Sequence, residues 1–582
     1  MFRFITQKLF YMALRMALTR KLLAVFIIVP AVFGCVTPQP EVSSTSAMLS
    51  SSGAGHYLRG RLAYKNYDLK DAAASFETAL KKSPNNPQLL RNSFVAELES
   101  GNISRAIKLM EYSQDKTDYF PFEKLVLGLN DVKYRNWAKS IKNFNNMAPS
   151  QLNSVLRPLL IGWAMVGQNK LTEARKTFSA LENRKGFELL GLLHTALAFQ
   201  GKEANKITDH SFEKALNYSP PPPRLLLAAA SHYSKSKRVE EAVKLIQEIK
   251  SHEYDYKNLE KSLKQSDPVG LAEISANSVK DGIAEVLFDI SKALQDDFES
   301  NRALIFVQLA LYLRPTFPQA QILLGELLHD RNKYSEAIAE YKKIPQKSIF
   351  YPIAQFRQSS CLTKLNEPEA AIKLLKLLAQ RIPNDPNRLA KIGDIQRTQK
   401  NWHEAINAYN DAIAFTTNIQ QTDWILFYSR GIAYEQSKNW DLAEQDFLEA
   451  LKLAPNQPFV MNYLGYAWTE LGINLNEAER MIKKAVKLRP SDGYITDSLG
   501  WVLYRTSKFS EAVPILERAV QLRPNDAIIN DHLGDAYWQV GRQTEAYYQW
   551  SRALTMEPDQ KLSANIKNKV KNGLKSPHSP GK

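Results

Sequence analysis

The chain has 582 residues, of which 44% are hydrophobic and 23% charged, and these proportions are ordinary for a folded protein. Its formal net charge of +16 would suit an anionic partner, but no motif that reads RNA or DNA accompanies the charge. A lysine-rich solvated surface is the simpler interpretation, and we expect no nucleic-acid partner. The two cysteines, Cys35 and Cys361, exclude a disulfide framework, and Cys361 is expected to be a small buried residue.

Residues 1–35 have the features of a signal peptide. A basic leader precedes an apolar run of about twelve residues from Leu22 to Phe33, the length of a signal hydrophobic region and short for a membrane span. The run ends at Gly34 and Cys35, which resemble the bacterial lipobox, where the cysteine is lipidated and becomes the mature N-terminus. We expect lipidation at Cys35. Ordinary secretion and an uncleaved anchor are the alternatives.

Residues 36–52 are rich in serine, threonine and proline and contain little that could be buried. This composition predicts a disordered tether between the anchor and the folded body. Because residue 36 is not aspartate, enterobacterial sorting would place such a lipoprotein at the outer membrane. The expected location is therefore the cell envelope, on the periplasmic face of the outer membrane.

Two consecutive stretches of 34 residues, 493–526 and 527–560, agree column by column. Each ends with a proline near the place where a helix would stop, because proline cannot donate the intrahelical hydrogen bond. We assign the crossing of two helices to recurring glycines and the facing position on the second helix to recurring alanines. These repeat-packing positions are Gly465, Gly500, Gly534, Ala478, Ala512 and Ala546.

A period of 34 residues with these columns is typical of the tetratricopeptide repeat (TPR), a helix–turn–helix unit. A single helix pair cannot bury its apolar face alone, so neighbouring repeats must stack. The sequence therefore predicts an all-α fold, a right-handed TPR superhelix (α-solenoid) of about 14 helix–turn–helix repeats.

The frame divides the chain into two blocks of repeats. About six repeats form an N-terminal block at 53–256, and about eight form a C-terminal block at 284–560. Residues 257–283 do not fit the frame and contain Asp267-Pro268 and Val269-Gly270, which are turn signals. We interpret 257–283 as an irregular joint, which is either a hinge or a packed extra helix pair.

Residues 561–582 are predicted to form a capping helix and a basic tail. An apolar stripe recurs every four residues at Leu562, Ile566 and Val570, and such a stripe would close the open end of the array. The lysines of this helix are expected to face water, and they are Lys561, Lys567, Lys569 and Lys571.

In stacked TPR repeats the first helices line the concave side, and the second, fifth, ninth and twelfth positions of each repeat should face the groove. In the last three repeats these positions mix aromatic with short polar side chains, which is what binding of an extended peptide or a helix requires. The predicted groove residues are Phe459, Asn462, Tyr466, Tyr494, Asp497, Trp501, Tyr504, Asp531, Asp535 and Trp538. Ile425, Tyr428, Phe356 and Phe288 would extend the strip. For Tyr466, Trp501 and Tyr504, packing between neighbouring repeats is the alternative.

The sequence offers no support for catalysis. The nine histidines are scattered, and the chain has no HExxH motif, no phosphate-binding glycine loop and no nucleophile elbow. We therefore expect a protein that is not an enzyme, with no metal, no cofactor and no small-molecule substrate.

The strings from Asn462 to Tyr466 and from Asp497 to Arg505 resemble a proteobacterial family of long TPR lipoproteins. This family includes the LbcA-type adaptors of carboxy-terminal processing proteases. The likeness covers the signal, tether and repeat array and is sharpest from about 424 to 560. The resemblance implies a scaffold that binds a periplasmic protease and its substrates, the peptidoglycan hydrolases. The competing interpretation is an assembly factor for outer-membrane proteins, pili or exported polysaccharide.

Overall fold

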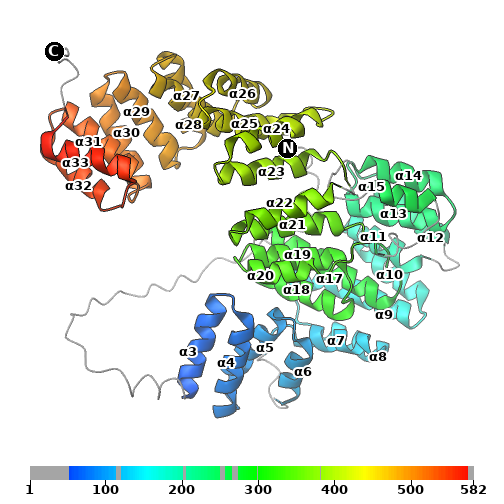
Figure 1. Cartoon of the computed structure of the whole chain (residues 1–582). Coiled ribbons are helices and arrows are strands. Elements are labelled where there is room, and N and C mark those ends of the chain that lie inside the picture. Colours follow the sequence, from blue (N-terminus) through cyan, green and yellow to red (C-terminus); the bar gives the residue numbers. More distant parts are fainter. Residues whose placement is uncertain are drawn as a thin grey trace. The chain divides into compact units, whose positions relative to one another are not determined.

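The computed structural model describes residues 52–112, 120–200, 205–249, 256–264, 273–297, 299–379 and 382–574. Within these ranges the regular structure is helical throughout, and fourteen antiparallel helix pairs follow one another along the chain (Figure 1). The predicted all-α repeat fold is confirmed. The predicted signal, Cys35 and residues 36–51 of the tether lie outside the described ranges. No helix in these ranges combines the length and the apolar character that a membrane span needs.

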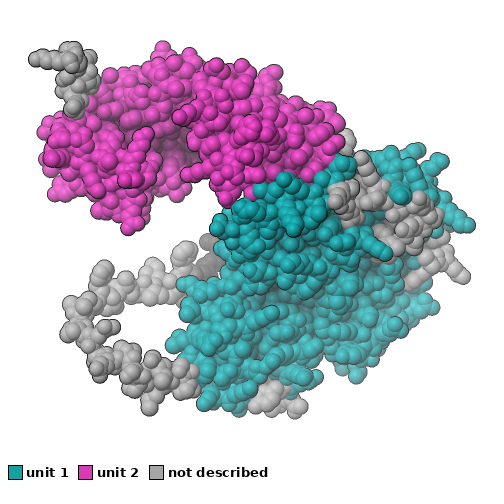
Figure 2. Space-filling model, viewed as in Figure 1, with its two compact units in different colours: residues 1–383 teal, residues 384–582 magenta. Residues whose placement is uncertain are grey.

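The chain forms two compact units, residues 1–383 (unit 1) and residues 384–582 (unit 2), shown in separate colours in Figure 2. The sequence had suggested a joint at 257–283, but the units divide after residue 383. The part of that joint described by the structure contains helix α15 and the start of helix α17, and residues 265–272 fall outside it.

Unit 1 contains nine of the helix pairs and one further helix among its described residues. Its helices are α3 (Gly53–Lys65), α4 (Leu69–Lys82), α5 (Pro87–Glu99), α6 (Ile103–Tyr112), α7 (Glu123–Lys133), α8 (Trp137–Asn145), α9 (Gln151–Gly167), α10 (Leu171–Glu182), α11 (Glu188–Phe199), α12 (Asn205–Leu216), α13 (Pro223–Lys235), α14 (Val239–Glu248), α15 (Tyr256–Lys264), α17 (Val279–Asp296), α18 (Ser300–Leu313), α19 (Pro318–His329), α20 (Tyr334–Tyr341), α21 (Tyr351–Lys364) and α22 (Pro368–Leu378).

Unit 2 contains five helix pairs and a final helix. Its helices are α23 (Pro386–Thr398), α24 (Trp402–Ala414), α25 (Trp424–Gln436), α26 (Trp440–Leu453), α27 (Pro458–Leu471), α28 (Leu475–Leu488), α29 (Gly493–Arg505), α30 (Phe509–Leu522), α31 (Ala527–Gln539), α32 (Gln543–Leu554) and α33 (Gln560–Asn572), with a short 3-10 helix at Gln421–Asp423.

The first helix of a repeat begins at a residue whose side chain satisfies its free N–H groups. Asp492 accepts hydrogen bonds from the backbone of Tyr494 and Ile495, and Asp526 does the same for Ile528 and Ile529. Such carboxylate caps also suit the positive end of the helix dipole. The local sequence therefore sets where each of these helices starts.

Glycine lies where the two helices of a repeat cross. A Cβ added at Gly500 would lie 2.4 Å from Leu516 Cγ, and one at Gly534 would lie 2.5 Å from the Trp550 ring. The side chain that faces each glycine is four residues after the expected alanine, so the predicted facing position is wrong. The alanines in question are buried on the second helices, and they are Ala478, Ala512 and Ala546.

Helices α17 and α18 pack against the first helices of the N-terminal repeats. Helix α17 contacts α7, α9 and α11, and α18 contacts α5 and α7. Phe306 on α18 meets Phe122 edge-on with 5.9 Å between ring centroids, and Tyr312 donates a hydrogen bond of 2.8 Å to Asn130 Oδ1. These contacts explain why the division falls beyond the predicted joint, because α17 and α18 share a core with the repeats before it.

Polar contacts hold α17 in the same place. The buried His194 on α11 accepts a hydrogen bond from Trp163 Nε1 at its Nδ1 (3.3 Å) and lies 3.2 Å from Asp289 on α17. Burial, followed by the charge of Arg224, lowers the pKa of His194, so the ring is neutral and donates from Nε2 to Asp289. Arg224 pairs with both Glu285 and Asp289 on α17. The two parts of unit 1 are therefore joined by satisfied buried polar groups as well as by apolar packing.

Candidate protein-binding site

The first helices form the inner wall of unit 2. Helix α23 packs against α25, α27 against α29, and α29 against α31, while Tyr428 on α25 and Tyr463 on α27 make an edge contact at 5.9 Å. In a curved stack the helices that lie closest to their equivalents are on the concave side. A partner entering the concave side of unit 2 would therefore meet first-helix side chains.

Four exposed apolar side chains occupy the second position of four successive first helices. Ile425 is 52% exposed, Phe459 39%, Tyr494 50% and Ile528 50%. We call these four residues the apolar row. Phe459 and Tyr494 were predicted groove residues, and Ile425 was a predicted extension. Ile528 was missed, although the 34-residue frame places it at the same position, because the prediction favoured aromatic residues.

Two arginines lie over the aromatic members of the apolar row. The Arg489 guanidinium is 5.0 Å from the Phe459 ring centroid, and that of Arg523 is 4.8 Å from the Tyr494 ring centroid. Each arginine follows the second helix of the same repeat, in a Leu-Arg-Pro sequence. The sequence prediction missed both residues, and the recurring Leu-Arg-Pro was the available signal.

The predicted groove residues Trp501 and Tyr504 lie mainly between repeats. Trp501 stacks on Tyr504 at 4.9 Å and on His532 at 3.9 Å, and its Nε1 donates a 2.6 Å hydrogen bond to Glu470 on α27. His532 Nδ1 lies 3.0 Å from the buried Asp497 carboxylate. Burial opposes protonation of His532, but Asp497 outweighs it and raises the pKa. These side chains join α27, α29 and α31, as the packing alternative predicted.

The predicted groove residues Asp531 and Asp535 are covered by helix α33. Lys569 on α33 donates to Asp531 Oδ2 at 2.8 Å and to Asp535 Oδ2 at 2.7 Å, and all three side chains are buried. Trp550 Nε1 donates a 2.9 Å hydrogen bond to Asp535 Oδ1. The predictions that the two aspartates line an open groove and that Lys569 faces water are wrong, because the lysine neutralises both carboxylates inside the cap.

The other predicted groove residues are partly or fully covered. A Cβ at Gly573 would lie 2.3 Å from the Trp538 ring, so the end of α33 also covers Trp538. Asn462 and Tyr466 are half-buried on α27. In unit 1, Phe288 is buried against Phe317, and Phe356, also predicted as an extension, is half-buried. Of the predicted groove residues, Phe459 and Tyr494 are the exposed ones.

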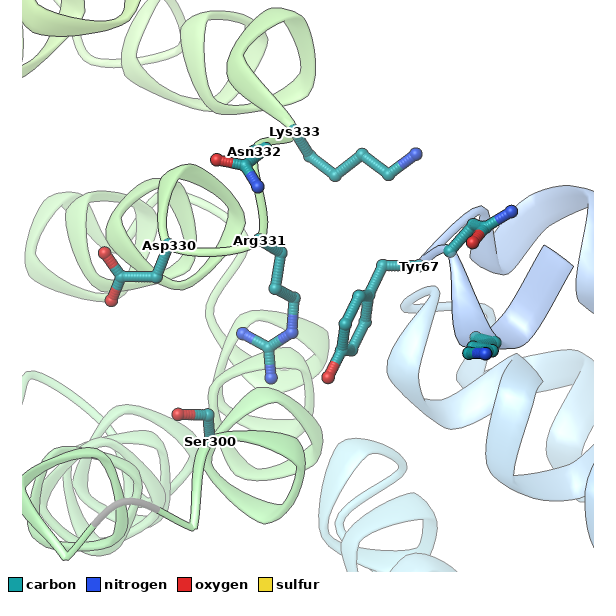
Figure 3. A pocket seen from close by; sticks show the side chains of 8 residues that line it. Tyr67, Ser300, Asp330, Arg331, Asn332 and Lys333 are labelled. Atoms are coloured by element: carbon teal, nitrogen blue, oxygen red, sulfur yellow. The ribbon is translucent and has the colours of Figure 1, made fainter. Parts of the chain in front are cut away.

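A pocket of about 550 Å³ lies within unit 1 (Figure 3). The turn between α3 and α4, the turn between α19 and α20 and the start of α18 form it. Its lining residues are Lys65, Asn66, Tyr67, Ser300, Asp330, Arg331, Asn332 and Lys333. Arg331 lies 4.9 Å from the Tyr67 ring centroid and donates to Asn301, so its guanidinium holds the two turns together. This lining contains no nucleophile paired with a base.

Reactive chemistry is also lacking around the cysteine and around acidic clusters. Burial raises the pKa of the Cys361 thiol to about 11, which leaves it protonated and unreactive, as expected of a buried core cysteine. In the described ranges, no three histidine, cysteine, aspartate or glutamate side chains are grouped in a way that would hold a metal ion.

Two models of the tetratricopeptide repeat match the chain, one at residues 424–457 and the other at 57–119, 474–527 and 498–560. The chain is 26% identical over 208 residues to the TPR repeat-containing protein PA4667 of Pseudomonas aeruginosa. The match covers 33% of this chain and 32% of that protein, so it spans about a third of the relative.

Among solved structures, the chain is similar to that of the APC/C hetero-tetramer Cut9-Hcn1, with 15% identity and a TM-score of 0.38 over 91% of this chain and 98% of that one. It is also similar to yeast Tom70, with 13% identity and a TM-score of 0.34 over 90% and 95% of the respective chains. The repeat models match segments on both sides of residue 383. The chain therefore carries tetratricopeptide repeats in both of its compact units.

Proposed function

We propose that this protein is a non-catalytic, envelope-anchored TPR scaffold that binds other proteins along the inner wall of unit 2. The contrast between the two units carries this proposal. In unit 1, α17 and α18 pack over the first helices of the N-terminal repeats, whereas in unit 2 the apolar row is exposed on four successive repeats. Exposed apolar side chains repeated in register favour a protein partner over a small molecule.

The envelope address rests on the signal-like N-terminal sequence and on Cys35. A lipid on Cys35 would hold the repeats at the periplasmic face of the outer membrane, with residues 36–52 as the tether. Two acyl chains or more give a stable anchor, because each buried methylene contributes about 0.8 kcal/mol. Labelling with a fatty acid that is lost in Cys35→Ser would support this address, and equal labelling of both chains would contradict it.

The partners that we propose are a periplasmic carboxy-terminal processing protease and its peptidoglycan hydrolase substrates. The resemblance of residues 424–560 to the family of long TPR lipoproteins supports this choice, as does the likeness to a Pseudomonas TPR protein. A scaffold of this kind would raise the effective concentration of substrate near the protease without performing chemistry itself.

Site-specific photocrosslinking in cells tests the proposal. A photoreactive residue at Ile425 or Tyr494 should capture protein partners, whereas one at Tyr548, which is 73% exposed on the second helix α32, should not. A serine protease and cell-wall hydrolases among the adducts would support the adaptor role. Adducts with export or assembly machinery would favour the assembly-factor alternative, and equal adducts from all three positions would contradict binding at the inner wall.

A further inference from the structure

The inner walls of the two units differ in chemistry at equivalent positions. In unit 1 the second, fifth and ninth positions of three successive repeats are all apolar, and they are Phe122, Leu125, Leu129, Leu156, Leu159, Trp163, Leu190, Leu193 and Leu197. That wide apolar wall packs against two helices, α17 and α18. A broad apolar surface is what a helix needs, because a helix with its side chains is about 10–12 Å across.

The exposed apolar surface of unit 2 is only one residue wide. Beside the apolar row, the fifth positions of the same four repeats hold Tyr428, Asn462, Asp497 and Asp531. A helix lying along the row would press its apolar face onto polar groups, and burying those groups without partners is unfavourable. An extended polypeptide can instead place alternate side chains in the row and keep the others in water.

The spacing of the row also suits an extended chain. Helices that pack directly are about 8–10 Å apart, and the first helices of unit 2 contact their neighbours in this way. An extended chain advances about 3.1–3.3 Å per residue, so three residues cover about 9–10 Å. Apolar side chains at every third residue of such a segment would meet successive members of the row.

Charge around the row favours an acidic segment. Arg489 and Arg523 lie against Phe459 and Tyr494, both arginines are exposed, and neither forms an ion pair with another described residue. The nearby carboxylate Asp492 already accepts hydrogen bonds from its own helix. The row therefore offers two unpaired guanidinium groups beside apolar contacts, and carboxylates of a ligand can pair with them.

We infer that the apolar row, with Arg489 and Arg523, binds an extended acidic polypeptide segment whose apolar side chains recur at every third residue. This inference rests on the proposed function, because it names the kind of segment that the scaffold recognises in its partners. Phe459 and Tyr494 supply the central contacts, and the two arginines select against basic segments.

Fluorescence anisotropy with the full chain and labelled peptides tests the inference. The probe is a peptide of about twelve residues, three for each of four repeats, with leucine at every third position and aspartates and serines between. The comparison peptides carry leucine at every fourth position, leucine on one face of a heptad helix, or lysine in place of aspartate. We expect the probe to bind at least about tenfold more tightly than each of them.

Matched variants locate the binding. The double variant Phe459→Ser and Tyr494→Ser should weaken binding of the probe about tenfold, while Tyr548→Ser on α32 should leave it unchanged. Exchanging both arginines, Arg489→Glu and Arg523→Glu, should reverse the preference, so that the lysine peptide binds better than the probe. Arg518→Glu, at an exposed position of the second helix α30, is the charge control and should leave the preference unchanged.

Tighter binding of the heptad peptide, equal binding of both spacings or an unchanged preference after the arginine exchange would overturn the inference. If all patterned peptides fail while crosslinking at Tyr494 still captures proteins, the scaffold function stands and the inference falls. If both experiments fail, the inner wall is not the binding surface.

Discussion

Trp501 and His532 stack face to face, with 3.9 Å between their ring centroids and 14° between their planes. The two rings belong to neighbouring repeats, α29 and α31, so the stack joins one repeat to the next. Asp497 lies within 3.0 Å of His532 Nδ1 and orients the imidazole under the indole. The relationship assigns Trp501 to the packing of the array, with part of its surface left on the inner wall.

Trp501→Ala should therefore destabilise unit 2 by about 2 kcal/mol, because it removes the ring contacts with Tyr504 and His532 and the hydrogen bond to Glu470. Tyr494→Ala, at an exposed position of the same helix, should change stability by no more than about 0.5 kcal/mol. Denaturant unfolding of the two variants measures the difference. Equal stability of the two variants would show that Trp501 does not join the repeats.

The repeat pattern predicted the helix pairs because each column depends on local geometry. Gly500 is required where α29 and α30 cross, and Asp492 caps the helix that begins next to it. Such requirements recur every 34 residues and can be read from one chain. The exposed positions of Phe459 and Tyr494 followed from the same frame.

Contacts between distant repeats could not be predicted in this way. His194 and Asp289 are 95 residues apart in sequence, and the contact of Gly282 with Trp163 spans several repeats. Neither pair leaves a mark in a 34-residue period. The place of Lys569 was missed for a related reason: a lysine on a helix is normally solvated, and only the folded array brings it to two buried aspartates.

Lys569→Met should release α33 from the last repeat. The substitution keeps the length of the side chain but leaves Asp531 and Asp535 buried without their cation, which costs about 3 kcal/mol or more. Hydrogen exchange over residues 560–572 should become faster, while exchange in α25 stays unchanged. The control is Lys567→Met, at an exposed position of the same helix, and it should leave exchange as it is. Unchanged protection in Lys569→Met would mean that the apolar contacts of α33 suffice.

The stability of unit 2 should depend on pH through Asp535. Burial raises the pKa of Asp535 to about 6, with the Asp531 charge adding to the rise and Lys569 opposing it. A carboxyl with a raised pKa binds its proton more tightly in the folded chain, so its contribution to stability is present at low pH and is lost between about pH 4 and 6. We expect the melting temperature of the unmodified chain to fall relative to that of Asp535→Asn over this range. A difference that is constant with pH, or that grows in favour of the unmodified chain, would contradict the raised pKa.

Gly282 should be essential for the docking of α17 on the N-terminal repeats. A Cβ at this position would lie 2.3 Å from the Trp163 ring, which is buried and held by its hydrogen bond to His194, so neither group can move away easily. Gly282→Val should therefore destabilise unit 1 by about 2 kcal/mol, even though valine favours helix more than glycine does. Asp296→Ala, at an exposed position near the end of the same helix, is the control. Hydrogen exchange followed over α9 and α17 together is the measurement, because a loss of docking should speed exchange in both helices at once. Faster exchange in α17 alone would place the effect within that helix, and would show that unit 1 does not depend on this contact to fill its inner wall.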